Sequence, residues 1–152
     1  MTICGNNKIV LLTCNNCTGM AKKLLPEIRL RYSEYLSVLP VDCPASFEPF
    51  VIIKLLKNCS DGVIVVCPKD VCCCPKNKSV MKRREIFRDI LPVFGLHSEQ
   101  LKIASISPLG GNKLIGIIEQ MLSFISINYK HPKECNLINF HPKYLQLLKW
   151  LS

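Results

Sequence analysis

The chain has 152 residues, of which 49% are hydrophobic and 20% are charged. A chain of this length and composition can bury one hydrophobic core, which excludes an intrinsically disordered protein and favours one domain with a short extension. The formal net charge of +9 suits an acidic protein, a nucleic acid or an anionic membrane as partner, and also suits a merely soluble surface.

The first half of the chain predicts two β–α units. Residues 8–14 form a continuous apolar run that is typical of a buried strand, and residues 19–32 show helical periodicity, although Pro26 is expected to kink or shorten that helix. Residues 36–43 predict a second strand. A second helix is expected at 48–58, with Ser and Pro residues suited to its N-terminus.

The second half predicts two more units of the same kind. Residues 62–67 are the clearest strand of the chain, and a basic helix is expected at 78–94, where Gly95 stops it. A fourth strand is expected at 101–107 and an amphipathic helix at 112–127. Four such units with apolar strands predict a parallel sheet that is covered by helices on both faces.

The expected fold is therefore α/β, a small doubly wound four-stranded parallel sheet of flavodoxin-like type with strand order 2-1-3-4 and a C-terminal extension. Residues 1–127 form this domain. Residues 128–152 fall outside the β–α pattern and predict a strap that ends in a short helix at 144–151. Such a short segment cannot fold alone, so it is expected to pack on the domain or on a partner.

The N-terminal residues lack the basic region, apolar stretch and cleavage site of a signal peptide. The longest apolar stretch, 114–127, contains Glu119 and Gln120 and is too short to span a bilayer. We therefore expect a cytoplasmic protein with no membrane partner. In that reducing compartment, ten cysteines suit metal or redox chemistry better than disulfides.

Seven of the ten cysteines follow the carboxyl ends of the first three predicted strands. They are Cys14 and Cys17 after the first strand, Cys43 at the end of the second, and Cys67, Cys72, Cys73 and Cys74 at and after the end of the third. Ligands bind at this edge of open α/β sheets, above all where the strand order reverses. We therefore expect these cysteines to converge in space although they are scattered in sequence.

Thiolates are soft ligands that select iron–sulfur clusters, zinc or Cu(I). A [2Fe–2S] cluster needs two ligands for each iron. The expected ligands are Cys14 and Cys17 for one iron and Cys67 and Cys72 for the other, with Cys43 and Cys73 as alternatives. Zinc is the main alternative to the cluster, because the C-x2-C and C-x4-C spacings also match loose zinc sites.

The segments KIVLLTCNNC, VDC, GVIVVCPKDVCC, KRREIF and LKIASISP together resemble the delta subunit of methyl-viologen-reducing hydrogenase, from about residue 8 to 127. The resemblance implies a [2Fe–2S] subunit of an oxidoreductase complex associated with methanogenesis. Its electrons would pass from a hydrogenase or formate dehydrogenase module to a heterodisulfide reductase A-type flavoprotein. The family's cysteines correspond to Cys14, Cys17, Cys43, Cys67 and Cys72. Where the family often has a further cysteine, this chain has Thr13.

Two other functions compete with electron transfer. A zinc-stabilised structural adaptor of a multisubunit complex would use the same thiols without redox chemistry. A thiol oxidoreductase would use Cys14 and Cys17, but no acid–base group accompanies them, since His97, His131 and His141 all lie in the C-terminal part of the chain.

A basic stripe on the third predicted helix raises the question of nucleic-acid binding. It consists of Lys82, Arg83, Arg84 and Arg88. The stripe lacks the interleaved aromatic residues of a single-strand binder, so nucleic acid is an unlikely partner. We expect it to dock an acidic protein.

Overall fold

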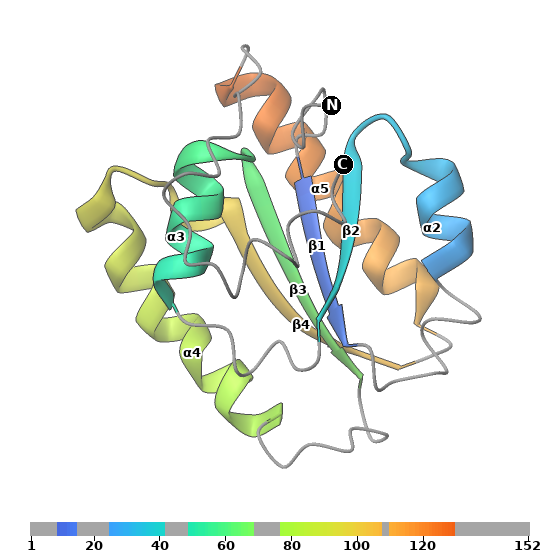
Figure 1. Ribbon diagram of the computed structural model, residues 1–152, viewed down its shortest axis with the longest axis horizontal. Coiled ribbons are helices and arrows are strands. Elements are labelled where there is room, and N and C mark those ends of the chain that lie inside the picture. The colour runs from blue at the N-terminus through green and yellow to red at the C-terminus, as the bar shows by residue number, and fades with distance from the viewer. Residues whose placement is uncertain (1–8, 15–24, 42–48, 69–76, 108–109, 130–152) are drawn as a thin grey trace.

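The computed structural model describes residues 9–14, 25–41, 49–68, 77–107 and 110–129. Within them, four parallel strands form one sheet in the order β2–β1–β3–β4 (Figure 1). The strands are β1 (Ile9–Cys14), β2 (Leu36–Val41), β3 (Gly62–Pro68) and β4 (Leu101–Ile106). The doubly wound α/β class and the strand order predicted from the sequence are confirmed.

Helices cover both faces of the sheet. On one face lie α3 (Pro49–Asn58) and α4 (Asn77–Ile90), and on the other lie α2 (Leu25–Arg31) and α5 (Gly111–Asn128) (Figure 1). Side chains alternate along each strand, so every strand contributes to both layers. Val10 and Leu12 of β1 pack toward α3, whereas Ile9 and Leu11 pack toward α5. This double burial explains why the strands are almost continuously apolar.

Prolines lie near the ends of two described helices. The described part of α2 begins at Leu25, next to Pro26, and residues 19–24 of the predicted helix lie outside the described residues, so the kink or shortening expected at Pro26 stays a prediction. Helix α4 ends at Ile90, and the chain continues as a 3-10 helix, η2 (Leu91–Phe94), because Pro92 cannot continue the α-helical hydrogen bonding. Gly95 then ends the segment with φ at 75°, a conformation that glycine adopts without strain.

A buried glutamine joins the starts of β3 and β4. Gln100 belongs to a short 3-10 helix, η3 (Ser98–Gln100), and is fully buried. Its side-chain N–H donates to the carbonyl oxygen of Asp61 at 3.0 Å, and its Oε1 accepts from the backbone N–H of His97 at 2.7 Å. These bonds hold the entry of β4 beside the entry of β3.

The C-terminal part of the prediction stays untested. Helix α5 runs one residue beyond the expected end, to Asn128, and residues 130–152, including the predicted helix at 144–151, lie outside the described residues. No helix in the described part of the chain combines the length and the apolar character that crossing a membrane requires.

Candidate metal centre

The carboxyl ends of β1 and β3 meet at the point where the winding of the sheet reverses. From β1 the chain crosses to β2 on one side, and it then returns past β1 to β3 on the other. In open α/β sheets such a switch point is where ligands bind. Two of the predicted ligands, Cys14 and Cys67, belong to these two strands.

The register places the two cysteines at the same level. Leu12 of β1 is opposite Val65 of β3, and each cysteine follows its paired residue by two positions. Paired strands lie roughly 4.8 Å apart, and Cys14 and Cys67 each lie two residues beyond the last recorded pair of β1 and β3, Leu12 and Val65. On its other side, Cys14 is opposite Val41 of β2, which Cys43 follows by two residues in the sequence.

Cys67 is a reduced cysteine that packs in the core layer between the sheet, α3 and α4. Its residue is 3% exposed and shares a cluster with Val65 and Val41. A cysteine in such surroundings often acts only as a small apolar side chain. Its place at the end of β3 distinguishes it from the other buried positions, because Pro68 ends the strand directly after it.

The remaining predicted ligands, Cys17, Cys43, Cys72 and Cys73, lie outside the described residues. Within the described part, no group of three or more histidine, cysteine, aspartate or glutamate side chains can hold a metal ion. The predicted ligand set, which draws on those four positions, therefore stays a prediction.

Cys59 has a different role from the seven clustered cysteines. It is 1% exposed at the end of α3 and is disulfide-bonded. The sequence predicts that the thiols of this chain serve metal or redox chemistry rather than disulfides, and Cys59 departs from that expectation. It is not among the candidate ligands.

Thr13 is a polar group at this edge that the metal-ligand prediction did not use. It is 2% exposed, and its hydroxyl oxygen has no hydrogen-bond partner among the described residues. An unsatisfied buried hydroxyl costs about 1–3 kcal/mol, so it needs an explanation. The resemblance marks this position as one where related chains often have a cysteine, but burial of the hydroxyl becomes visible only in the fold.

His97 serves a structural purpose. Its Nδ1 accepts the backbone N–H of Glu99 at 3.2 Å and so caps η3, and its ring lies 4.8 Å from that of Phe124. It lies beside the entry of β4, at the opposite edge of the sheet from the carboxyl ends. It therefore lies away from Cys14 and Cys67, the two candidate ligands that the structure describes.

The chain is similar to a known family and to several known proteins. Residues 9–127 match the family model described as methyl-viologen-reducing hydrogenase, delta subunit. The chain is 29% identical over 114 residues to the iron-sulfur subunit of an F420-non-reducing hydrogenase from Archaeoglobus profundus, covering 74% of this chain and 83% of that protein.

Two larger proteins contain a similar segment. The chain is 28% identical over 116 residues to the A-type subunit of a ferredoxin/F(420)H(2)-dependent CoB-CoM heterodisulfide reductase from Methanosarcina acetivorans. It is 27% identical over 116 residues to the A-type subunit of a ferredoxin:CoB-CoM heterodisulfide reductase from Methanosarcina mazei. Each match covers 75% of this chain but only 15% of the larger protein, so the similarity concerns one part of those proteins.

Proposed function

The chain belongs to the family of methyl-viologen-reducing hydrogenase delta subunits, and on this premise we propose that it is an electron-transfer subunit with a [2Fe–2S] cluster. The cluster would receive electrons from a hydrogenase or formate dehydrogenase module. It would pass them to a flavoprotein of the heterodisulfide reductase A type. The subunit has no catalytic residues of its own in this account, and its expected location is the cytoplasm.

The observation that carries the proposal is the shared level of Cys14 and Cys67 at the switch point of the sheet. Cys14 and Cys67 are separated by more than fifty residues of chain, yet they lie at the carboxyl ends of neighbouring strands, β1 and β3. The other candidate ligands follow the ends of β1, β2 and β3 in the sequence. Thiolates from two loops are the donor set that a [2Fe–2S] cluster requires. The name of the Archaeoglobus profundus relative, an iron-sulfur subunit, points to the same class of cofactor.

One further feature of this edge fits an anionic sulfur-rich group. The Thr13 hydroxyl does not contribute to it, because alternation along β1 directs this side chain to the face of Ile9 and Leu11, opposite to the face that holds Cys67. Helix α4 begins at the same edge (Figure 1), and a helix N-terminus favours negative charge nearby. When bound, the cluster supplies a one-electron redox couple.

The partners in this proposal come from the relatives. One relative is a hydrogenase subunit of similar length, and two are heterodisulfide reductase subunits in which a similar segment is part of a longer chain. A module found both as a separate subunit and as part of a larger one fits a relay between the two kinds of complex.

The proposal is tested on protein purified and kept without oxygen. We expect a brown protein with iron and acid-labile sulfide in equal amounts, whose visible absorption bleaches with dithionite and whose reduced form gives an electron paramagnetic signal. A colourless protein that contains zinc and lacks acid-labile sulfide would instead identify a zinc-stabilised adaptor.

A further inference from the structure

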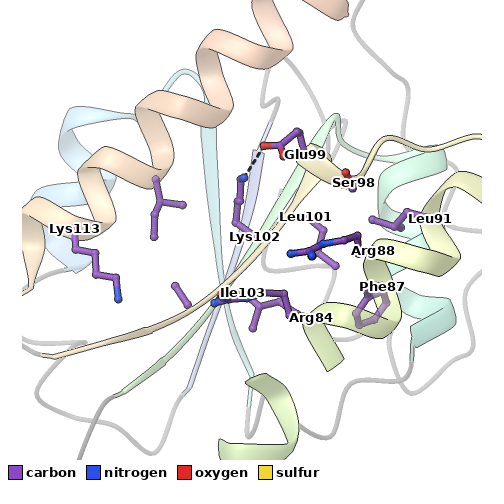
Figure 2. A pocket seen from close by; sticks show the side chains of 12 residues that line it. Arg84, Phe87, Arg88, Leu91, Ser98, Glu99, Leu101, Lys102, Ile103 and Lys113 are labelled. Atoms are coloured by element: carbon purple, nitrogen blue, oxygen red, sulfur yellow. Dashed lines mark hydrogen bonds and ion pairs between the residues drawn. The ribbon is translucent and has the colours of Figure 1, made fainter. Parts of the chain in front are cut away.

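A groove runs along the outer side of β4, between α4 and α5, and encloses about 320 Å³. We call it the β4 groove and define it by Arg84, Arg88, Leu91, Ile103, Lys113 and Ile117. Figure 2 shows the arginines reaching over the strand from α4, and Lys113 reaching toward it from α5. The groove lies at the far side of the sheet from β2, and neither Cys14 nor Cys67 is among the described residues that line it.

Among the described strands, β4 pairs only with β3, so the β4 groove lies along an edge of the described sheet. The carbonyl oxygen of Ile103 accepts from Nη2 of Arg84 at 2.5 Å, and that of Ser105 accepts from Nζ of Lys113 at 3.2 Å. Both carbonyls therefore point away from β3. In an extended strand the N–H of a residue points to the same side as its C=O, so the amides of Ile103 and Ser105 also face the groove.

The groove has more positive than negative charge. Its only carboxylate is that of Glu99, which is paired with Lys102 at 2.6 Å. Among the described residues, no carboxylate pairs with Arg84, Arg88 or Lys113. Arg84 and Lys113 each use one donor on the strand and retain others. The three cations can therefore bind carboxylates of another molecule, and arginine does so with good geometry.

The two sides of the groove differ in chemistry. On the α4 side, Arg84 and Arg88 stand above buried Phe87, whereas on the α5 side Ala104 and Ile117 form an apolar surface. Successive side chains of an added strand point to opposite faces. A segment in which acidic and apolar residues alternate would direct its carboxylates to the arginines and its apolar side chains to α5.

We propose that the β4 groove binds an extended acidic segment of a partner protein, which adds to the sheet as a strand beside β4. Strand addition to an open edge is a common mode of peptide recognition. The segment displaces the Arg84 and Lys113 donors from the edge carbonyls, and its carboxylates receive the guanidinium groups of Arg84 and Arg88 on the α4 side.

Charge argues for an acidic partner over two other occupants, a second copy of the chain and its own residues 130–152. A second copy carries a net charge of +9, and residues 130–152 contain four lysines and one glutamate. Both would bring positive charge to a positive groove. Two arginines of the predicted basic stripe differ in their contacts. Arg84 donates a hydrogen bond to the edge strand, so its substitution would also disturb the strand. Arg88 has no such bond among the described residues and is therefore the residue to test.

The test uses the full chain and a fluorescent peptide in which valine and glutamate alternate over nine residues. Its binding is measured by fluorescence anisotropy at constant salt. Reversal of charge in Arg88→Glu should weaken binding about fivefold or more. The matched control is Arg29→Glu, an equal change of net charge at an exposed position of α2, at the opposite side of the sheet; it should leave binding nearly unchanged.

Two further measurements separate strand addition from general attraction between charges. A peptide of the same sequence with alternate backbone nitrogens methylated should bind at least tenfold more weakly, because it cannot complete the ladder. In hydrogen exchange, the unmodified peptide should protect the amides of Ile103 and Ser105. Circular dichroism of each variant shows that it is folded before binding is compared.

Any of four results would overturn the proposal. They are the absence of peptide binding, equal weakening by Arg29→Glu and Arg88→Glu, equal binding of the methylated peptide, and displacement of the peptide by inorganic pyrophosphate at concentrations that match the peptide's own affinity. The last result would identify a site for small anions. None of these outcomes depends on whether the protein binds a cluster, so the proposal fails or succeeds separately from the proposed function.

Discussion

Tyr32 joins two helices on the face of the sheet that the cysteine prediction did not consider. Its hydroxyl donates to Oε1 of Glu119 at 2.6 Å, which connects α2 to α5. Burial of the ring raises the pKa of Tyr32 above its usual value of 10, and the hydrogen bond to Glu119 raises it further, whereas Arg31 acts in the opposite direction. The fold therefore holds the phenolic proton more tightly than the unfolded chain does.

This raised pKa predicts a loss of stability in alkali. Because the folded state favours the protonated phenol, the contribution of Tyr32 is complete below pH 10 and is lost as the pH rises through the higher pKa of the folded state. In Tyr32→Phe, we expect the unfolding free energy near pH 7 to fall by about 1 kcal/mol, through loss of the bond to Glu119. Above pH 10 the difference from the wild-type protein should shrink.

Urea unfolding from pH 8 to pH 11 measures the effect. The pKa of Tyr129 is also raised, by burial and by Asp61, so both the wild-type protein and Tyr32→Phe lose stability at high pH through Tyr129. The effect of Tyr32 is therefore the difference between the unfolding free energies of the two proteins. A difference in unfolding free energy between the wild-type protein and Tyr32→Phe that stays constant from pH 8 to pH 11 would contradict the raised pKa of Tyr32.

At the scale of elements, the packing of α5 on β3 depends on a glycine. A Cβ added at Gly62 would lie 2.4 Å from the sulfur of Met121 and 3.1 Å from Cδ1 of Ile125. The helix therefore approaches the start of β3 more closely than a side chain there allows. Gly116, on the same helix, has nothing within 4 Å of such a Cβ and is exposed.

The two glycines predict opposite effects of adding a side chain. Gly62→Val should reduce the free energy of unfolding by about 1–3 kcal/mol, because the core must move to accept the extra volume. Gly116→Ala should increase it by about 0.5–1 kcal/mol, because alanine loses less backbone entropy in a helix. Denaturant unfolding of both variants checks the pair. Destabilisation of equal size in both would mean that α5 does not pack as described.

The sequence predicted the elements better than their ends. Apolar runs bounded by polar turns identified all four strands of the described sheet, because strands buried on both faces have little freedom in composition. The boundary of α4 was wrong because helical periodicity continues through 3-10 geometry to Phe94, whereas the α-helical hydrogen bonds stop near Pro92. The kink or shortening expected at Pro26 stays a prediction, because residues 19–24 of that helix lie outside the described residues.

At the scale of the whole molecule, the strand order was predictable because right-handed β–α–β connections leave few arrangements of four units. The sequence predicted where the candidate site lies in the fold, but not which side chains meet there. Strand ends position Cys14 and Cys67, whereas the other candidate ligands lie outside the described residues and no strand periodicity in the sequence places them. The sequence signalled only one side of the β4 groove, the basic stripe with Arg84 and Arg88, because Lys113 is brought beside these arginines only by the packing of α4 and α5 around an edge strand.

The central claim is that a cluster is held at the carboxyl edge of the sheet, with Cys67 as one ligand. Cys67→Val keeps the apolar packing and removes the thiolate, and Cys67→Ser offers a weaker ligand. The matched control is Val65→Ala, which lies two residues earlier in the same core cluster and should cost about 2 kcal/mol of stability without removing a ligand.

The decisive measurement is therefore iron and acid-labile sulfide per chain in these proteins, purified without oxygen. We expect the wild-type protein and Val65→Ala to contain the same amounts, and both Cys67 variants to lose most of their iron and sulfide while remaining folded. Full iron and sulfide in Cys67→Val would show that this thiol only packs in the core, and would contradict the account.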